Sequence, residues 1–320
     1  GKEYRRAFSL SSSPVTDSDL RVTIKRVPGG VVSNYLRDHV QAGEEIEVMP
    51  PMGNFGFVPR PENSQHYVLI GGGSGITPLM SIIKTVLAVE PQSKLTLWYC
   101  NRDEASIIFC RQLEALAARY PERLVVYHTL TRPGADWQGP RGRLDQERIY
   151  QLILELFMED TYPKQYYLCG PEGLMQAARA AFEQHAIHPS FVHQEHYSAP
   201  LPTDEELAAA EAAAAASTAI SDGEHTYELT TRKVRLCLEG ATHTLEVSPE
   251  KSILDVAIDA KLDPPYACQS GICTTCRAML LQGVVSMDET EGLSEEEIQQ
   301  GYVLTCQAHP LTEDVELEYR

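Results

Sequence analysis

The chain has 320 residues, and its composition of 43% hydrophobic and 22% charged residues is that of a globular protein, which excludes wholesale disorder. This length suggests two or three domains of about 100–200 residues each. Asp and Glu outnumber Lys and Arg by 45 to 27, so a nucleic-acid partner is not expected. Because no apolar run reaches the ~18–20 residues of a membrane span and residues 1–20 show no apolar signal-peptide core, we expect a cytoplasmic protein without a membrane partner.

The negative charge is concentrated in the C-terminal third of the chain. Residues 225–320 carry seven basic and seventeen acidic side chains, whereas residues 1–201 carry twenty and twenty-two. This asymmetry indicates a separate acidic module with its own partner surface. Residues 202–224 contain six acidic side chains and an Ala-rich stretch, which predicts a solvated linker with partial helix.

Residues 1–61 predict a small β-rich domain. Alternating apolar residues between turn-forming residues indicate strands at 3–10, 20–27 and 45–49, and a short helix is expected at 31–41.

Residues 62–201 change to short apolar strands that alternate with helices. Expected strands lie at 66–70, 95–99, 124–129, 166–169 and 191–197. Expected helices lie at 78–89, 106–119, 145–158 and 171–185. Such alternation predicts an α/β domain whose parallel sheet is covered by helices on both faces.

Residues 225–320 predict a third domain of the α+β class. Two alternating segments, 233–238 and 243–247, flank Glu239-Gly240 like the strands of a hairpin. A helix is expected at 252–260.

Four of the eight cysteines have a spacing that indicates a metal centre. Cys268, Cys273, Cys276 and Cys306 form C-x4-C-x2-C followed by one distant cysteine, which is the spacing of plant-type [2Fe–2S] proteins. Gly271 permits the loop backbone to approach the cluster. A structural zinc site is the alternative, but zinc sites favour paired short spacings. We therefore predict that these four thiolates hold a [2Fe–2S] cluster.

A glycine-rich turn separates the first strand and the first helix of residues 62–201. A turn of this kind directs backbone N–H groups and the positive end of a helix at a pyrophosphate. Its sequence differs from the G-x-x-x-x-G-K-[ST] of nucleoside triphosphatases, and a plain tight turn is the alternative interpretation. The residues expected to bind a dinucleotide are Gly71, Gly72, Gly73, Ser74, Gly75 and Thr77.

Five motifs, in this order, resemble the ferredoxin–NADP reductase superfamily over about residues 1–200. They are R-A-F-S at 6–9, G-V-V-S-N-Y-L at 30–36, the glycine-rich turn, C-G-P at 169–171 and E-H-Y at 195–197. The resemblance implies an antiparallel β-barrel that binds FAD, followed by an α/β domain that binds NAD(P).

The resemblance also implies roles for individual residues. Arg6 would contact the FAD pyrophosphate, Phe8 would lie against the isoalloxazine ring, and Ser9 would sit near flavin N5. The remaining flavin-binding residues would be Gly30, Val31, Ser33 and Tyr197. Gly170 and Pro171 would lie beside the nicotinamide, and the catalytic residues would be Ser9, Cys169 and Glu195.

The order of flavin, pyridine-nucleotide and β-grasp ferredoxin domains resembles the reductase components of bacterial multicomponent oxygenases. Segments 49–57 and 301–310 resemble in particular the reductase subunits of ring-1,2-phenylacetyl-CoA epoxidases. The resemblance implies that electrons pass from NADPH through FAD and the cluster to an oxygenase component, a di-iron hydroxylase or epoxidase. Two departures are notable. The family's first barrel strands are absent, so an incomplete flavin domain is expected at 1–61, and Cys100 replaces the usual glycine.

The coenzyme is expected to be NADP, with NAD the less favoured choice. In reductases of this type, the loops after the second and third strands of the nucleotide domain face the adenosine ribose. Arg102, Thr131 and Arg132 lie there, and cations suit the 2′-phosphate of NADPH. Asp103 and Glu104 favour NADH instead.

Three alternatives remain open from the sequence. The chain could serve another mono- or dioxygenase, or act only as an electron carrier if it binds no flavin. It could also be a redox sensor that uses Cys100 and Cys110.

Overall fold

The computed structural model describes residues 4–27, 29–197, 219–221, 225–269, 271–290 and 292–319. The chain forms two compact units. One consists of Phe8–Glu44 and Asn54–Tyr197, and the other of Gly1–Ala7, Glu45–Gly53 and Ser198–Arg320. We call them the nucleotide unit and the ferredoxin unit and describe each by itself.

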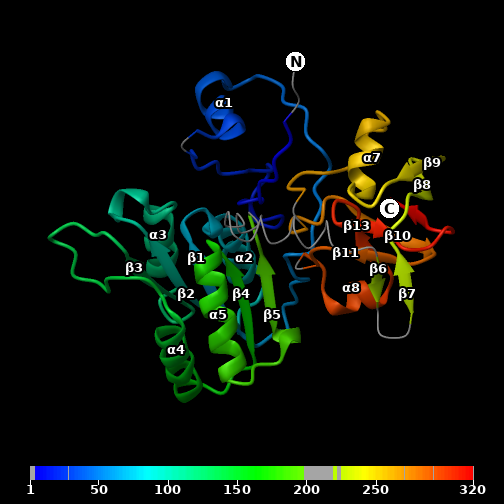
Figure 1. Cartoon of the computed structure of the whole chain (residues 1–320). Helices are drawn as coiled ribbons and strands as arrows, with labels where there is room; N and C mark the ends of the chain where they lie inside the picture. The colour runs from blue at the N-terminus through cyan, green and yellow to red at the C-terminus, as the bar shows by residue number, and fades with distance from the viewer. Residues whose placement is uncertain are drawn as a thin grey trace. The chain divides into compact units, whose positions relative to one another are not determined.

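The nucleotide unit contains the parallel sheet that the sequence predicts (Figure 1). Its strand order is β3-β2-β1-β4-β5. The strands are β1 (His66–Gly72), β2 (Lys94–Asn101), β3 (Leu124–Leu130), β4 (Lys164–Cys169) and β5 (Val192–Glu195). The helices are α2 (Ile76–Val89), α3 (Cys110–Arg119), α4 (Gln146–Glu159) and α5 (Glu172–Gln184), with short 3-10 turns η1 (Gly73–Gly75), η2 (Glu104–Ser106) and η3 (Pro189–Phe191).

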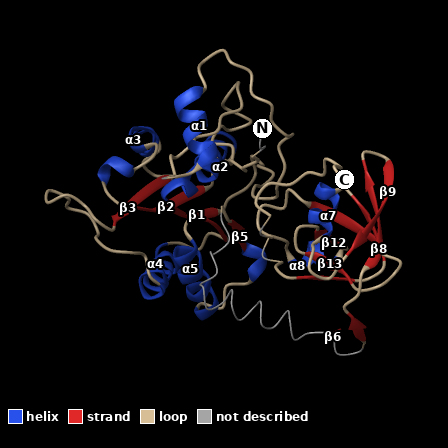
Figure 2. Cartoon of the chain, turned by 45° about the horizontal axis from the view of Figure 1, so that its top comes forward, coloured by secondary structure: helices blue, strands red, loops and turns tan. Residues whose placement is uncertain are grey.

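Two apolar layers hold this sheet. Figure 2 shows α2 and α3 above the sheet and α4 and α5 below it. Every residue of β1 is buried, as expected for a central strand with helices on both faces. Leu69 packs with α2 and α3 on one face, and Ile70 packs with α4 and α5 on the other. The near-continuous apolar sequence of β1 is therefore explained by burial on both sides.

The strand order places a switch point at the carboxyl end of β1. From β1 the chain proceeds outward to β2 and β3, and then returns to the other side of β1 with β4 and β5. Ligands of open α/β sheets bind in the crevice at such a point. The glycine-rich turn follows β1 directly, so the topology places it at this crevice.

The first 61 residues contain fewer strands than the sequence predicts. Helix α1 (Val31–His39) forms as expected. The expected strands at 3–10 and 20–27 meet in one bridge between Leu10 and Val22, and 45–49 forms no strand in the described part of the chain. Isolated extended segments gain little stability without several paired neighbours.

The ferredoxin unit is built around a five-stranded mixed sheet, ordered β12-β10-β14-β8-β9. These strands are β8 (Arg232–Leu238), β9 (Ala241–Val247), β10 (Arg277–Gln282), β12 (Tyr302–Leu304) and β14 (Glu316–Glu318). Helix α7 (Ile253–Asp259) packs on the sheet, and α8 (Glu295–Gln299) precedes β12. The smaller pairs are β11 (Val285–Met287) with β13 (Ala308–Pro310) and β6 (Ala219–Ser221) with β7 (Thr226–Glu228).

The β8–β9 hairpin and the helix after it confirm the sequence-based expectation. The expected linker at 202–224 lies outside the described residues, except for β6.

Candidate active site and cluster loop

The glycine-rich turn is shaped by close backbone approaches. A Cβ on Gly75 would lie 1.9 Å from the carbonyl oxygen of Cys169, so only glycine fits where α2 begins against the end of β4. Gly73 has φ +54°, in the left-handed region. Helix α2 has no side-chain N-cap bond and no acidic residue in its first turn. The N–H of Ile76, the first residue of α2, already donates to the carbonyl oxygen of Ser74, so the N–H groups that follow it in the first turn are the ones that could meet an anion such as a pyrophosphate.

The C-G-P motif at the end of β4 faces this turn. A Cβ on Gly72 would lie 2.5 Å from Cδ of Pro171, and one on Gly170 would lie 3.0 Å from the backbone nitrogen of Gly72. The structure thus brings the two glycine-containing segments together, as expected if both contact one dinucleotide. Gly71 does not face the C-G-P motif. A Cβ on Gly71 would lie 3.0 Å from Cδ1 of Leu79, so the absence of a side chain there makes room for Leu79.

The three predicted catalytic residues converge although they are far apart in sequence. Ser9 Oγ donates a hydrogen bond to Glu195 Oε2 at 2.6 Å. Cys169 Sγ lies 3.9 Å from the same carboxylate oxygen. β4 and β5 pair in parallel with Cys169 opposite Glu195, which fixes the two side chains at the carboxyl edge of the sheet.

Burial determines the protonation states of Glu195 and Cys169. Burial raises the pKa of Glu195 to about 7, against the lowering effect of the Ser9 hydrogen bond. Burial and the nearby Glu195 charge raise the pKa of Cys169 well above its usual range. Cys169 is therefore a neutral thiol rather than a nucleophilic thiolate, and Glu195 is the group that can exchange a proton near neutral pH.

Tyr197 joins this group to the glycine-rich turn. Its hydroxyl and Thr77 Oγ1 share a hydrogen bond of 2.6 Å, and it also reaches the carbonyl oxygen of Ser74 at 3.4 Å. Tyr99 donates to the carbonyl oxygen of Gly73 at 2.8 Å. Two tyrosines thus hold the backbone of the turn in place.

The other predicted flavin residues lie at the start of the chain and at α1. Gly30 is the N-cap of α1, whose first turn has neither a side-chain cap nor an acidic residue. Val31 is 52% exposed. The buried Ser33 instead accepts from the N–H of Val27 at 3.2 Å and shapes the turn. Phe8 is half-buried and Arg6 is exposed.

The predicted ribose-binding residues lie together at the ends of β2 and β3. The N–H of Thr131 donates to the carbonyl of Asn101 at 3.0 Å, and that of Arg132 to the carbonyl of Arg102 at 2.7 Å. Both arginines are exposed.

Asp103 and Glu104 have structural partners. The Asp103 carboxylate accepts from the N–H of Ser106 at 2.9 Å. The Glu104 carboxylate accepts from the N–H of Gly134 at 3.2 Å. These hydrogen bonds shape the loops after β2 and β3.

Two residues that the sequence analysis did not predict, Lys25 and Asn101, lie near the glycine-rich turn and at the end of β2. The Lys25 ammonium would lie 3.0 Å from a Cβ on Gly73, so a cation reaches the glycine-rich turn. Asn101 is 6% exposed, and neither amide atom has a hydrogen-bond partner among the described residues. No sequence motif marks Lys25, whereas Asn101 could have been found from its place beside Arg102.

The four predicted cluster cysteines form two pairs in the ferredoxin unit. Cys268 and Cys273 each accept the other's backbone N–H at 3.3 Å. The sulfurs of Cys276 and Cys306 lie 3.2 Å apart. The hydrogen bond with Cys306, together with burial, raises the pKa of Cys276. Among the described residues these thiols form two pairs and no larger group of metal-ligating side chains, so their assignment as the four cluster ligands stays a prediction.

The other cysteines give no support to a redox sensor. Burial raises the pKa of Cys100 to about 12. Burial and the Glu114 carboxylate also raise the pKa of Cys110. Reactive sensor thiols need a lowered pKa, so neither side chain is activated for that chemistry.

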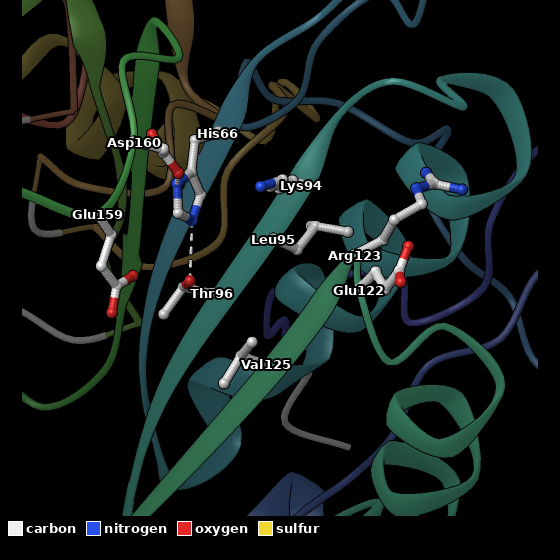
Figure 3. Close-up of a pocket in the computed structure, with 9 residues that line it drawn as sticks. All are labelled: His66, Lys94, Leu95, Thr96, Glu122, Arg123, Val125, Glu159 and Asp160. Carbon is white, nitrogen blue, oxygen red and sulfur yellow. Dashed lines mark hydrogen bonds and ion pairs between the residues drawn. The ribbon is translucent and has the colours of Figure 1, made fainter.

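A cavity of about 260 Å³ lies at the opposite edge of the sheet, where β1 and β2 begin (Figure 3). Some of its polar groups are paired with each other or with the backbone. His66 bonds Asp160 and Thr96 at 2.8 Å each. The Arg123 guanidinium donates to backbone carbonyls near the end of α2, including that of Glu90 at 2.7 Å. These pairings give His66 and Arg123 structural roles, and none of the predicted site residues lines this cavity.

Three family models match the chain in the predicted order. They are an oxidoreductase FAD-binding domain over residues 1–57, an oxidoreductase NAD-binding domain over 69–180 and a 2Fe-2S iron-sulfur cluster binding domain over 237–311. One component of the 1,2-phenylacetyl-CoA epoxidase of Escherichia coli is 33% identical, over 100% of this chain and 85% of that protein. The chain belongs to the family of oxygenase reductases.

Other relatives agree with this assignment. The ferredoxin reductase component of 3-ketosteroid-9-alpha-monooxygenase from Rhodococcus rhodochrous is 34% identical, over 98% of this chain and 82% of that protein. Among solved structures, phthalate dioxygenase reductase shares the fold, with a TM-score of 0.53 and 19% identity over 98% of this chain and 83% of that chain.

The reductase is an NAD(P)H-dependent oxidoreductase with FAD, NAD-binding and [2Fe–2S] domains, and it acts in a multicomponent oxygenase system. Within the described residues, no helix is both long enough and apolar enough to cross a membrane.

Proposed function

We propose that this reductase takes electrons from NADPH and delivers them to a di-iron epoxidase that acts on phenylacetyl-CoA, as part of phenylacetate catabolism. The observation that carries the redox role is the meeting of Ser9, Cys169 and Glu195 beside the glycine-rich turn. When bound, the nicotinamide and flavin supply hydride transfer, and the cluster supplies one-electron transfer.

The protein's own residues position these groups and handle a proton. Glu195, with its pKa near 7, can accept a proton from Ser9 Oγ or return one over their 2.6 Å bond. Cys169, buried and neutral, presents a compact apolar wall at the end of β4. Arg6, Phe8, Gly30, Val31 and Ser33 are proposed to hold FAD.

The preference for NADPH rests on charge at the ends of β2 and β3. Arg102 and Arg132 are exposed there, where either guanidinium can reach a phosphate. Asp103 and Glu104, which would suit the ribose hydroxyls of NADH, are instead hydrogen-bonded to loop N–H groups. Exposed arginines and hydrogen-bonded carboxylates therefore favour the ribose 2′-phosphate of NADPH over the ribose hydroxyls of NADH.

The proposed modules follow the sequence. They are residues 1–61 for FAD, 62–201 for NADPH, the linker 202–224, and 225–320 for the cluster held by Cys268, Cys273, Cys276 and Cys306. The last module is strongly acidic, so its acceptor is expected to present a basic surface.

The coenzyme is tested by anaerobic titration of the purified chain with NADPH and with NADH. The flavin and cluster absorption bands are followed separately. We expect both bands to bleach with NADPH, with a higher kcat/KM for NADPH than for NADH. A higher kcat/KM for NADH would refute the coenzyme assignment, and a spectrum without flavin would support the electron-carrier alternative.

The acceptor is tested by reconstitution. The chain is mixed with the oxygenase component of a phenylacetyl-CoA epoxidase or, as a matched control, with that of 3-ketosteroid-9-alpha-monooxygenase. We expect NADPH-dependent product only with the first. Faster turnover with the second would overturn the proposed partner while leaving the reductase activity intact.

A further inference from the structure

A tyrosine at the end of β14 reaches the residues that hold the cluster ligands. Tyr319 follows β14, the middle strand of the ferredoxin sheet, and its N–H donates to the carbonyl of Cys237 at 3.0 Å. Its ring packs against the core of the ferredoxin unit. The backbone is therefore held in place, and the hydroxyl has a defined position.

That hydroxyl lies 2.7 Å from Thr305 Oγ1. Thr305 is fully buried and stands next to the ligand Cys306 in sequence. Both its N–H and its hydroxyl reach the carbonyl oxygen of Cys276, at 3.2 Å and 3.0 Å. The carbonyl of Thr305 in turn accepts from the N–H of Leu254 at 2.9 Å. Thr305 is thus fixed between the two buried ligands.

The donor directions in this chain of hydrogen bonds are determined by counting protons. A hydroxyl has one proton to donate, and Thr305 uses its proton on the Cys276 carbonyl. The proton between Tyr319 and Thr305 must therefore come from Tyr319. The two O–H dipoles point the same way, from the end of β14 toward the ligand strand, and such aligned bonds strengthen each other.

We propose that Tyr319 is a positioning residue of the cluster site that acts through Thr305 to raise the reduction potential of the cluster. Reduction adds a negative charge at the site. A relay whose positive ends point at the carbonyl of Cys276 weakens the negative field of that carbonyl and so favours the added electron. Hydrogen bonds around the ligands tune such centres. This inference rests on the cluster assigned under the proposed function.

The test is a redox titration of the full-length chain, with the cluster followed by its EPR signal. Tyr319→Phe keeps the ring and removes only the hydroxyl. We expect its cluster potential to shift to a more negative value, while iron content and the rate of cluster loss to a chelator stay as in the wild type. The control is Tyr302→Phe, because that ring packs in the apolar cluster that contains Cys276 and Cys306; its potential should not move.

The route through Thr305 is tested by a double-mutant cycle. Thr305→Val should lower the potential, and adding Tyr319→Phe to it should cause no further shift. Thr305→Ser, which keeps a hydroxyl, should restore the wild-type value. An unmoved potential in Tyr319→Phe, or additive shifts in the double variant, would overturn the inference. If Tyr319→Phe does not fold, the restoration by Thr305→Ser relative to Thr305→Val still decides whether the relay exists. A wild-type chain without any iron–sulfur signal would refute the cluster assignment instead.

Discussion

Replacing Glu195 by Gln should stabilise the nucleotide unit at alkaline pH and have little effect at acid pH. Burial raises the pKa of Glu195 from 4.5 to about 7 in the folded chain. Between these values the native state binds more protons than the unfolded state. Stability therefore falls as the pH rises through this window and stays low above it. The glutamine of the variant is neutral at every pH and can still accept the Ser9 hydrogen bond.

The size of the effect follows from the shift in pKa. One pKa unit corresponds to about 1.36 kcal/mol, so the ionised Glu195 costs the folded state about 3 kcal/mol at pH 8. At pH 5 the native carboxyl is already protonated, and the cost is about 1 kcal/mol or less. The stability advantage of Glu195→Gln over the wild type should therefore grow by about 2 kcal/mol or more between pH 5 and pH 8.

Urea unfolding followed by tryptophan fluorescence measures this difference. The chain has two tryptophans. Both, Trp98 and Trp137, belong to the nucleotide unit, so the signal reports on that unit. The control is Glu159→Gln, because Glu159 is an exposed carboxylate at the end of α4 in the same unit. An advantage of Glu195→Gln that is the same at pH 5 and pH 8 would show that burial does not perturb this carboxyl.

Three more predictions address the cofactor sites. Gly75→Ala should displace the end of β4, because the added Cβ would lie 1.9 Å from the carbonyl oxygen of Cys169. We expect the KM for NADPH to rise and the stability reported by tryptophan fluorescence to fall. An unchanged KM would contradict the assigned role of the glycine-rich turn. Arg102→Ala or Arg132→Ala should cost NADPH about 1.5–3 kcal/mol in kcat/KM, the range for hydrogen bonds to charged groups. NADH use should barely change, whereas equal losses with both coenzymes would indicate a structural role. Cys306→Ala should lose the cluster and electron delivery to the oxygenase while NADPH still reduces the flavin; normal oxygenase turnover would show that electrons bypass the cluster.

Local patterns of residues were enough to predict the arrangement of the nucleotide unit and the nature of the cluster loop. Apolar runs separated by helical patterns are local signals, and burial of β1 on both faces requires such a run. The spacing of Cys268, Cys273 and Cys276 is also local, since these three predicted ligands lie on one loop. The strands expected within residues 1–61 were less predictable, because a strand depends on neighbours that its own sequence does not specify.

The chemistry at the edge of the sheet came instead from contacts between distant segments. Ser9 and Glu195 are separated by 186 positions, yet they share a 2.6 Å hydrogen bond. Lys25 reaches the glycine-rich turn although no motif marks it. Tyr319 can form its hydrogen bond with Thr305 because β14 is paired into the ferredoxin sheet. Hydrogen-bond partners and shifted pKa values depend on which groups are removed from water together. Which groups are removed from water together depends on how distant segments pack, and a local pattern of residues does not specify this packing.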